Sequence, residues 1–210
     1  GPVLSVSRLA GLPPLSNALP LEPPEGAWWV WQRTPANLGH SPLDGINKKN
    51  VDDLRLSWTW SLPPGANMMT PIVHDGVMFT LSSGDVVQAI DATTGDLLWA
   101  YQHEFEGEKP SESKKGVAIW EDKIIVGTSD IKLIALEAKT GRLAWEHEIN
   151  TNGEVDHRFK SAPMVVNDKA IFGLVGQMAV AGGNFIVAID LNSGEEAWRF
   201  YTIARPDELY

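Results

Sequence analysis

The chain has 210 residues, of which 43% are apolar and 21% charged, a composition typical of a folded globular protein rather than a disordered one. Its 27 acidic residues outnumber 17 basic ones, and the formal net charge of −10 argues against binding to nucleic acid or to an anionic membrane surface. The absence of cysteine excludes disulfides, thiolate metal sites and cysteine nucleophiles, and no apolar stretch is long enough for a membrane-spanning helix.

Residues 1–27 are rich in proline and show neither a helical nor an alternating apolar period. This pattern predicts an extended arm that runs over a surface, with a mobile tail as the alternative. From Trp28 onward the composition changes to short apolar runs separated by turn residues, so residues 28–210 are expected to form a second region.

One eleven-residue phrase occurs three times in this second region. Each copy begins with alanine, has an acidic residue two positions later, continues with a Thr-Gly or Ser-Gly pair and ends in tryptophan; the copies span 89–99, 135–145 and 188–198. The closing residues Trp99, Trp145 and Trp198 lie 46 and 53 residues apart, and Trp58 lies 41 residues before the first. A period of this length indicates a repeat architecture.

Each repeat is predicted to contain four short strands, because runs of β-branched and aromatic residues alternate with Asp, Asn and Gly. The inner strands expected before the tryptophan-bearing strand span 70–73, 77–81 and 86–90 in the first repeat, 116–120, 123–128 and 133–136 in the second, and 162–166, 170–173 and 185–189 in the third. A further strand is expected around Trp58. The chain is therefore predicted to be all-β.

The glycine of each Thr-Gly or Ser-Gly pair is expected to take the positive φ that reverses the third strand into the fourth. The acidic residues Asp91, Glu137 and Asp190 are expected to be turn residues rather than catalytic ones. The tryptophan then lies on the outer strand, where its indole fills the gap between neighbouring four-stranded sheets.

The repeated phrase resembles the tryptophan-docking motif of the quinoprotein alcohol dehydrogenases, the β-propellers related to the large subunit of methanol dehydrogenase. The N-terminal signature of that family is also matched, by Trp31-Gln32, Ser41-Pro42-Leu43, Ile46-Asn47 and Asn50-Val51. The resemblance implies an eight-bladed ring, of which this chain supplies about half as a partial β-propeller: a ring-closing strand near Trp58 followed by three blades.

An open arc leaves apolar faces uncovered. We therefore expect a second chain, a second copy or the remaining half of the polypeptide to complete the propeller. The resemblance further implies a periplasmic or otherwise exported protein that passes electrons to a cytochrome, with a c-type cytochrome as a candidate partner.

The family holds pyrroloquinoline quinone (PQQ) on the ring axis, together with Ca²⁺ or a lanthanide. By resemblance, Thr128 contacts the cofactor, and Lys115 replaces an arginine that precedes a glycine. Gly176 and Gln177 fall in a glycine-rich turn near the cofactor, so these four residues are the candidate cofactor-binding residues.

Two methionines fall at positions where the family has glutamates, namely Met68 and Met178. A thioether does not replace a carboxylate as a ligand for a hard cation, so the usual metal site is expected to be damaged in this chain. The catalytic aspartate of the family lies beyond residue 210, and no catalytic residue is assigned to this chain.

The five histidines show no metal-ligand spacing and are expected at the surface or in turns; they are His40, His74, His103, His147 and His157. Two functions remain open. The first is the N-terminal half of a PQQ-dependent alcohol dehydrogenase that oxidises an alcohol or aldehyde. The second is a non-catalytic propeller of the same repeat family that acts as a scaffold or assembly subunit.

Overall fold

The structure, a computed structural model, describes residues 8–15, 22–106, 114–151, 156–176 and 183–205. Within these ranges the chain consists of strands and loops, apart from a helical turn at 8–11 and the 3-10 helix η1 (Val51–Asp53). No helix in this part of the chain is long and apolar enough to cross a membrane.

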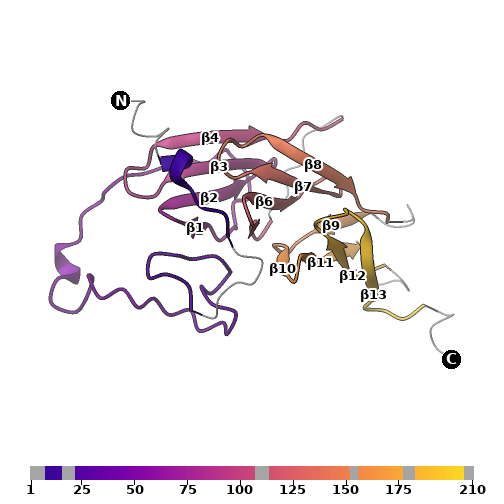
Figure 1. Cartoon of the computed structure of the whole chain (residues 1–210), viewed down its shortest axis with the longest axis horizontal. Coiled ribbons are helices and arrows are strands. Elements are labelled where there is room, and N and C mark those ends of the chain that lie inside the picture. The colour runs from indigo at the N-terminus through magenta and orange to yellow at the C-terminus, as the bar shows by residue number, and fades with distance from the viewer. Residues whose placement is uncertain (1–7, 16–21, 107–113, 152–155, 177–182, 206–210) are drawn as a thin grey trace.

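Three antiparallel sheets follow one another in chain order (Figure 1). The first contains β1 (Ile72–His74), β2 (Val77–Ser82), β3 (Val86–Asp91) and β4 (Leu97–Gln102). The second contains β5 (Ala118–Trp120), β6 (Lys123–Gly127), β7 (Lys132–Glu137) and β8 (Leu143–Glu148). The third contains β10 (Met164–Val166), β11 (Lys169–Gly176), β12 (Phe185–Asp190) and β13 (Glu196–Tyr201), with β9 (His157–Phe159) paired to β11. The predicted all-β architecture, a partial β-propeller of four-stranded blades, is confirmed.

Two elements differ from the sequence-based expectation. Strand β9 was not predicted; it pairs with the far end of β11, where Leu174 lies opposite Phe159. The segment around Trp58 was expected to be a strand, but residues 54–70 have no strand assignment. In the described part of the chain, no strand offers this segment a hydrogen-bonded neighbour.

The core consists of two apolar clusters, one on each side of the second sheet. Because side chains alternate along a strand, Ile124 and Val126 of β6 belong to the cluster shared with the first sheet, whereas Ile125 belongs to the cluster shared with the third. Phe79 and Trp99 fill the first cluster. Phe159, Phe172 and Phe185 fill the second.

The repeated phrase forms the turn between the third and fourth strand of every sheet. Its glycines, Gly95, Gly141 and Gly194, have φ of +79°, +71° and +75°, as expected for a left-handed turn position. Asp91 closes its turn by accepting a hydrogen bond from the Thr93 N–H at 2.8 Å. In each sheet the register also shifts just after the alanine that begins the phrase, so the repeat determines a bulge as well as a turn.

Part of the N-terminal segment lies against the first two sheets. Arg8 pairs with Asp91 at 2.7 Å, and Leu12 and Leu15 are buried in the first cluster. The Leu15 N–H donates to the carbonyl of Glu121 in the second sheet at 2.9 Å. Residues 8–15 thus join two sheets by contacts that include both apolar burial and charge.

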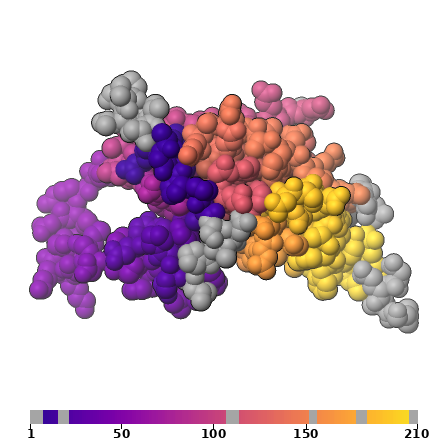
Figure 2. All heavy atoms as spheres, in the orientation of Figure 1, coloured from indigo at the N-terminus to yellow at the C-terminus, as the bar shows by residue number. Residues whose placement is uncertain are grey.

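Residues 38–62, which follow the first tryptophans, extend away from the sheets. Figure 2 shows an opening between this segment and the first sheet. Several of its large apolar side chains are exposed, namely Leu38, Leu43, Ile46, Leu54, Leu56 and Leu62. Trp58 returns the chain to the first sheet by donating its indole N–H to the Ala92 carbonyl at 3.1 Å.

Candidate functional site

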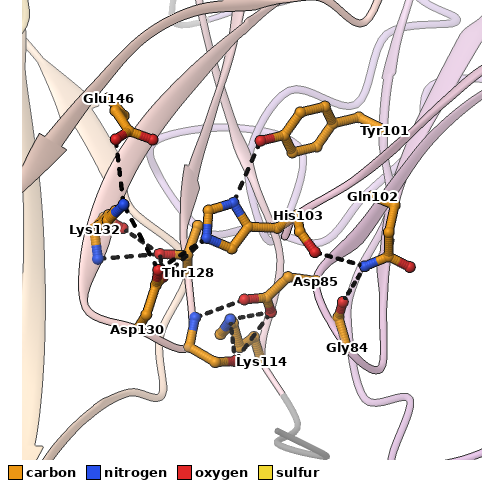
Figure 3. A network of polar contacts seen from close by, with 11 residues as sticks. Gly84, Asp85, Tyr101, Gln102, His103, Lys114, Thr128, Asp130, Lys132 and Glu146 are labelled. Carbon is orange, nitrogen blue, oxygen red and sulfur yellow. Dashed lines mark hydrogen bonds and ion pairs between the residues drawn. The ribbon is translucent and has the colours of Figure 1, made fainter. Parts of the chain in front are cut away.

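Four loops of the first and second sheets meet at one edge. They are the β2–β3 turn, the segment after β4, the segment before β5 and the β6–β7 turn, all at the same ends of antiparallel strands. Their side chains form a network of polar contacts that joins the two sheets (Figure 3).

A buried ion pair lies at the centre of this network. The Lys114 ammonium contacts the carboxylate of Asp85 and donates to the Ser129 hydroxyl at 2.8 Å. The second oxygen of Asp85 accepts the Ser129 N–H at 2.5 Å. The side chains of Asp85 and Lys114 are 2% and 3% exposed, so each charge depends on the other for its solvation.

A second cluster lies beside the first and is centred on Asp130. His103 Nε2 lies 3.0 Å from both carboxylate oxygens of Asp130, and His103 Nδ1 lies 3.3 Å from the Tyr101 hydroxyl. The two clusters are connected, because the His103 N–H donates to the carbonyl of Asp85 at 3.2 Å. Both therefore hold the β6–β7 turn against the first sheet.

These contacts determine the protonation of the two acids in the cluster. Burial alone would raise the pKa of Asp130, but hydrogen bonds from Thr128 and His103 outweigh it and keep the pKa below its ordinary value of 3.8. Burial and the nearby carboxylates of Glu146 and Asp130 raise the pKa of Tyr101. At neutral pH Asp130 is thus an ionised acceptor and Tyr101 a protonated phenol.

Thr128 lies inside this network. Its hydroxyl donates to Asp130 at 2.5 Å and accepts the Lys132 N–H at 3.0 Å, and the residue is fully buried. Its backbone N–H donates to the carbonyl of Lys132 at 2.8 Å. In this arrangement Thr128 stabilises the β6–β7 turn, and its hydroxyl proton is already engaged.

Lys115 differs from its neighbour Lys114 in being exposed and in having no ion pair within the described residues. Its carbonyl accepts the Thr70 N–H at 3.0 Å. The next residue, Gly116, has φ +151°, and a Cβ there would lie 3.1 Å from the carbonyl oxygen of Thr70. The backbone of Lys115 is thus held close to the first sheet, although the residue is exposed.

The remaining sequence-predicted residues are not brought into this network. Gly176 ends β11 in the third sheet, where its N–H donates to the Asn184 side chain at 2.7 Å. Gln177 and Met178 lie outside the described residues. Met68 is 55% exposed in the loop before β1.

The described residues contain no group of three or more histidines and acids arranged to hold a metal ion. A cavity of about 560 Å³ lies elsewhere, between the segment around Trp29–Asn37 and the strands β5 and β10. Its lining is mostly apolar and includes none of Thr128, Lys115 and Gly176.

Sequence reasoning missed the central residues of the network, and its expectation for the histidines was wrong at three positions. His74, His103 and His157 are each 5% exposed rather than superficial. His74, for example, accepts the Trp29 indole N–H at 3.1 Å and contacts the Pro13 carbonyl at 2.8 Å. The one available signal was the corresponding placement of Asp85 and Asp130, each just before the third strand of its repeat.

The residues present can be tested against a planar quinone that carries several carboxylates. Such a ligand needs cations and N–H donors. Lys115 meets this need as an exposed ammonium, whereas Lys114 is neutralised by Asp85 and Thr128 is buried. Lys115 is therefore the exposed lysine of the loop before β5 that a carboxylate of such a ligand could pair with.

Comparison with known proteins gives a consistent result. Residues 28–209 match the family model for the β-propeller domain of PQQ glucose/ethanol/alcohol dehydrogenases. The chain is 35% identical to the dehydrogenase subunit of the quinone alcohol dehydrogenase of Gluconacetobacter polyoxogenes, over 86% of this chain and 26% of that protein.

Two solved structures are similar in fold. The quinohemoprotein alcohol dehydrogenase of Comamonas testosteroni superposes with a TM-score of 0.77 at 30% identity, covering 95% of this chain and 30% of that one. A europium-containing methanol dehydrogenase superposes with a TM-score of 0.77 at 28% identity, covering 90% of this chain and 34% of that one. The chain thus spans between a quarter and about a third of the length of these relatives.

The three sheets, the repeated turns between them and the match over residues 28–209 agree. The chain belongs to the family of PQQ-dependent glucose, ethanol and alcohol dehydrogenases, as a part of its β-propeller domain.

Proposed function

We propose that this chain is an N-terminal arc of a PQQ-dependent dehydrogenase that oxidises an alcohol or aldehyde and passes the electrons to a cytochrome. The observation that carries this proposal is the exposed Lys115 ammonium, held beside the polar edge of two blades in a chain of this family. PQQ, when bound, supplies a quinone that accepts electrons from the alcohol. This chain does not supply the base, which we assign to blades beyond residue 210.

The residues of this arc bind and orient rather than react. Lys115 offers a positive charge to a carboxylate of the cofactor. Thr128, proposed from the family resemblance as a contact, supports the site by keeping the β6–β7 turn closed. Gly176 and Gln177 remain proposed as part of the cofactor wall on the third blade.

Met68 cannot serve as a ligand for Ca²⁺ or a lanthanide, because a thioether does not replace a carboxylate on a hard cation. Europium is named for one structural neighbour. We derive no step through a metal in this chain.

A partner is proposed for the outer face of the third blade. Trp198 is 42% exposed, whereas Trp99, at the same repeat position, is buried against the second blade. Other exposed apolar side chains of the third blade are Met164, Val166, Val175 and Phe200. We propose that further blades, from a second chain or the second half of the polypeptide, cover this face in a periplasmic protein.

The alternative function is a non-catalytic scaffold of the same fold. The exposed methionine at position 68, where the family has a glutamate, favours it. Because a scaffold would present the same blades without using PQQ, the two functions differ in a direct assay.

The test is alcohol-dependent dye reduction by the full-length protein, reconstituted with PQQ and either Ca²⁺ or La³⁺. The enzyme proposal expects turnover with simple alcohols that depends on added PQQ. It also expects Lys115→Gln to raise the PQQ concentration needed for half-maximal activity. A folded, assembled protein that shows no turnover and binds no PQQ would support the scaffold.

A further inference from the structure

We infer that the buried Asp85–Lys114 pair is a positioning device for Lys115. On this view Asp85 and Lys114 determine where the protein presents a cation to the carboxylates of the quinone, without contacting the quinone themselves. The inference rests on the proposed function, because it concerns the same site.

The first argument is the number of contacts that hold the loop around Lys115. On one side, the Lys114 ammonium is bound by Asp85 and by the Ser129 hydroxyl. On the other side, the carbonyl of Lys115 accepts the Thr70 N–H, and Gly116 packs close to the Thr70 carbonyl. The peptide that bears Lys115 is therefore held on both sides, and only the side chain is left free to meet a ligand.

The second argument is that the anchor itself is rigid. The backbone of Asp85 has φ +55°, an uncommon value for a residue other than glycine. Its carboxylate accepts the Ser129 N–H and its carbonyl accepts the His103 N–H. His103 in turn contacts Asp130, so the anchor joins the first blade to the β6–β7 turn of the second. Because residues of two blades hold Asp85 in place, Asp85 in turn restricts the motion of the loop that bears Lys115.

The third argument concerns the choice between two adjacent lysines. A buried ion pair is weak support for stability, but it is well suited to fixing the register of a segment. With Lys114 bound by Asp85, a slip of the loop by one residue would bury Lys115 and expose Lys114. The pair therefore specifies which of the two lysines faces the ligand.

The test uses the full-length protein and a variant that keeps the site free of unpaired charge. Lys114→Met alone leaves the Asp85 carboxylate buried without a cation, and we expect this variant to lose too much stability to be informative. The double variant Asp85→Asn with Lys114→Met removes both charges and retains an oxygen that accepts the Ser129 N–H. Arg142→Met, which removes an exposed ion pair with Glu137 at the opposite edge of the second blade, is the matched control.

Three quantities are measured. They are the Kd for PQQ, the acetylation of Lys114 and Lys115 with and without PQQ, and the exchange rate of the Thr70 amide in the absence of PQQ. In the wild-type protein we expect Lys115 to be acetylated and protected by PQQ, and Lys114 to be unreactive. In the double variant we expect a Kd that is between about ten- and a hundredfold higher, loss of the protection of Lys115, and faster exchange of the Thr70 amide. The control variant should match the wild-type protein in all three.

The outcomes separate the two proposals. If the wild-type protein binds PQQ and the double variant has the same Kd and the same protection of Lys115, the positioning role is wrong and the proposed function stands. If the wild-type protein binds no PQQ, both are overturned. A double variant that loses thermal stability but retains the wild-type Kd would show that the pair is only structural, which also overturns the inference.

Discussion

The interface between the first and second blades and the interface between the second and third are built from the same repeat, but they close differently. At the first interface, the Trp99 indole donates to the Ala138 carbonyl at 2.9 Å and lies against Gly141. At the second, Gly194 has the place of Gly141, but the nearest atom to a Cβ there is Nδ1 of His147 at 3.7 Å. Among the described residues, Trp145 donates no indole hydrogen bond.

The second interface is held by other residues of the two blades. There the Trp120 indole of the second blade donates to the Asp168 carboxylate of the third at 3.0 Å, and the Phe159 ring lies against Gly127. Within the described part of the chain, the polar network with its buried ion pair lies at the first interface. The repeated phrase thus determines the turn in every blade, whereas the contacts that the phrase makes with the neighbouring blade differ from one interface to the next.

The largest expected difference between the two interfaces comes from their tryptophans. Trp99→Ala should lower the free energy of unfolding by about 3–5 kcal/mol, because it removes a buried side chain and leaves a cavity. Trp145→Ala should cost only about 1–2 kcal/mol, since Trp145 is partly exposed. Urea denaturation followed by circular dichroism measures both, and equal losses would contradict the difference between the interfaces.

The turn glycines give a second comparison with smaller effects. Gly141→Ala places a Cβ 2.6 Å from the Trp99 ring at a positive φ and should cost about 2–4 kcal/mol. Gly194→Ala has the same backbone strain but ordinary contacts, and should cost about 1–2 kcal/mol. The same denaturation experiment applies. A larger loss of unfolding free energy for Gly194→Ala than for Gly141→Ala would contradict the closer packing at the first interface.

The loss of stability at acid pH tests the contacts that Asp130 makes at the first interface. Its pKa in the folded protein is below the ordinary value of 3.8, so its contribution is fully present above that pH and is lost as the pH falls through the lower folded pKa. Asp130→Asn should therefore flatten the decline in stability below about pH 4. Thermal melts recorded from about pH 2.5 to about pH 6 check this expectation. If the variant loses stability at acid pH as steeply as the wild-type protein, Asp130 is not stabilised by the hydrogen bonds from Thr128 and His103.

The smallest expected effect is at the N-terminal segment. Arg8→Gln removes a partly exposed ion pair with Asp91, which is worth about 1 kcal/mol or less. The loss should appear in the melting of the first two blades only, because residues 8–15 contact no residue of the third blade among their hydrogen bonds. Amide exchange resolved by blade would show it, and faster exchange in the third blade would argue against this placement.

The sequence allowed the sheets and the turns to be predicted because their signals are local. The run of β-branched residues in β6 and the Asp-x-x-x-Gly spacing at Asp91 and Gly95 each act within a few residues. The Asp85–Lys114 pair could not be predicted in the same way, because its partners are separated by 29 residues and belong to different blades. His103 was expected at the surface for the same reason: its burial depends on Asp130, which is 27 residues away.

The central claim is that this arc presents Lys115 to PQQ, and the most direct test is a titration of the full-length protein with PQQ followed by the absorbance of the bound quinone. We expect saturable binding to the wild-type protein, and a Kd about tenfold higher for Lys115→Gln because one charge-assisted hydrogen bond is lost. Absence of saturable binding, or a Lys115→Gln variant that binds as tightly as the wild-type protein, would contradict the account.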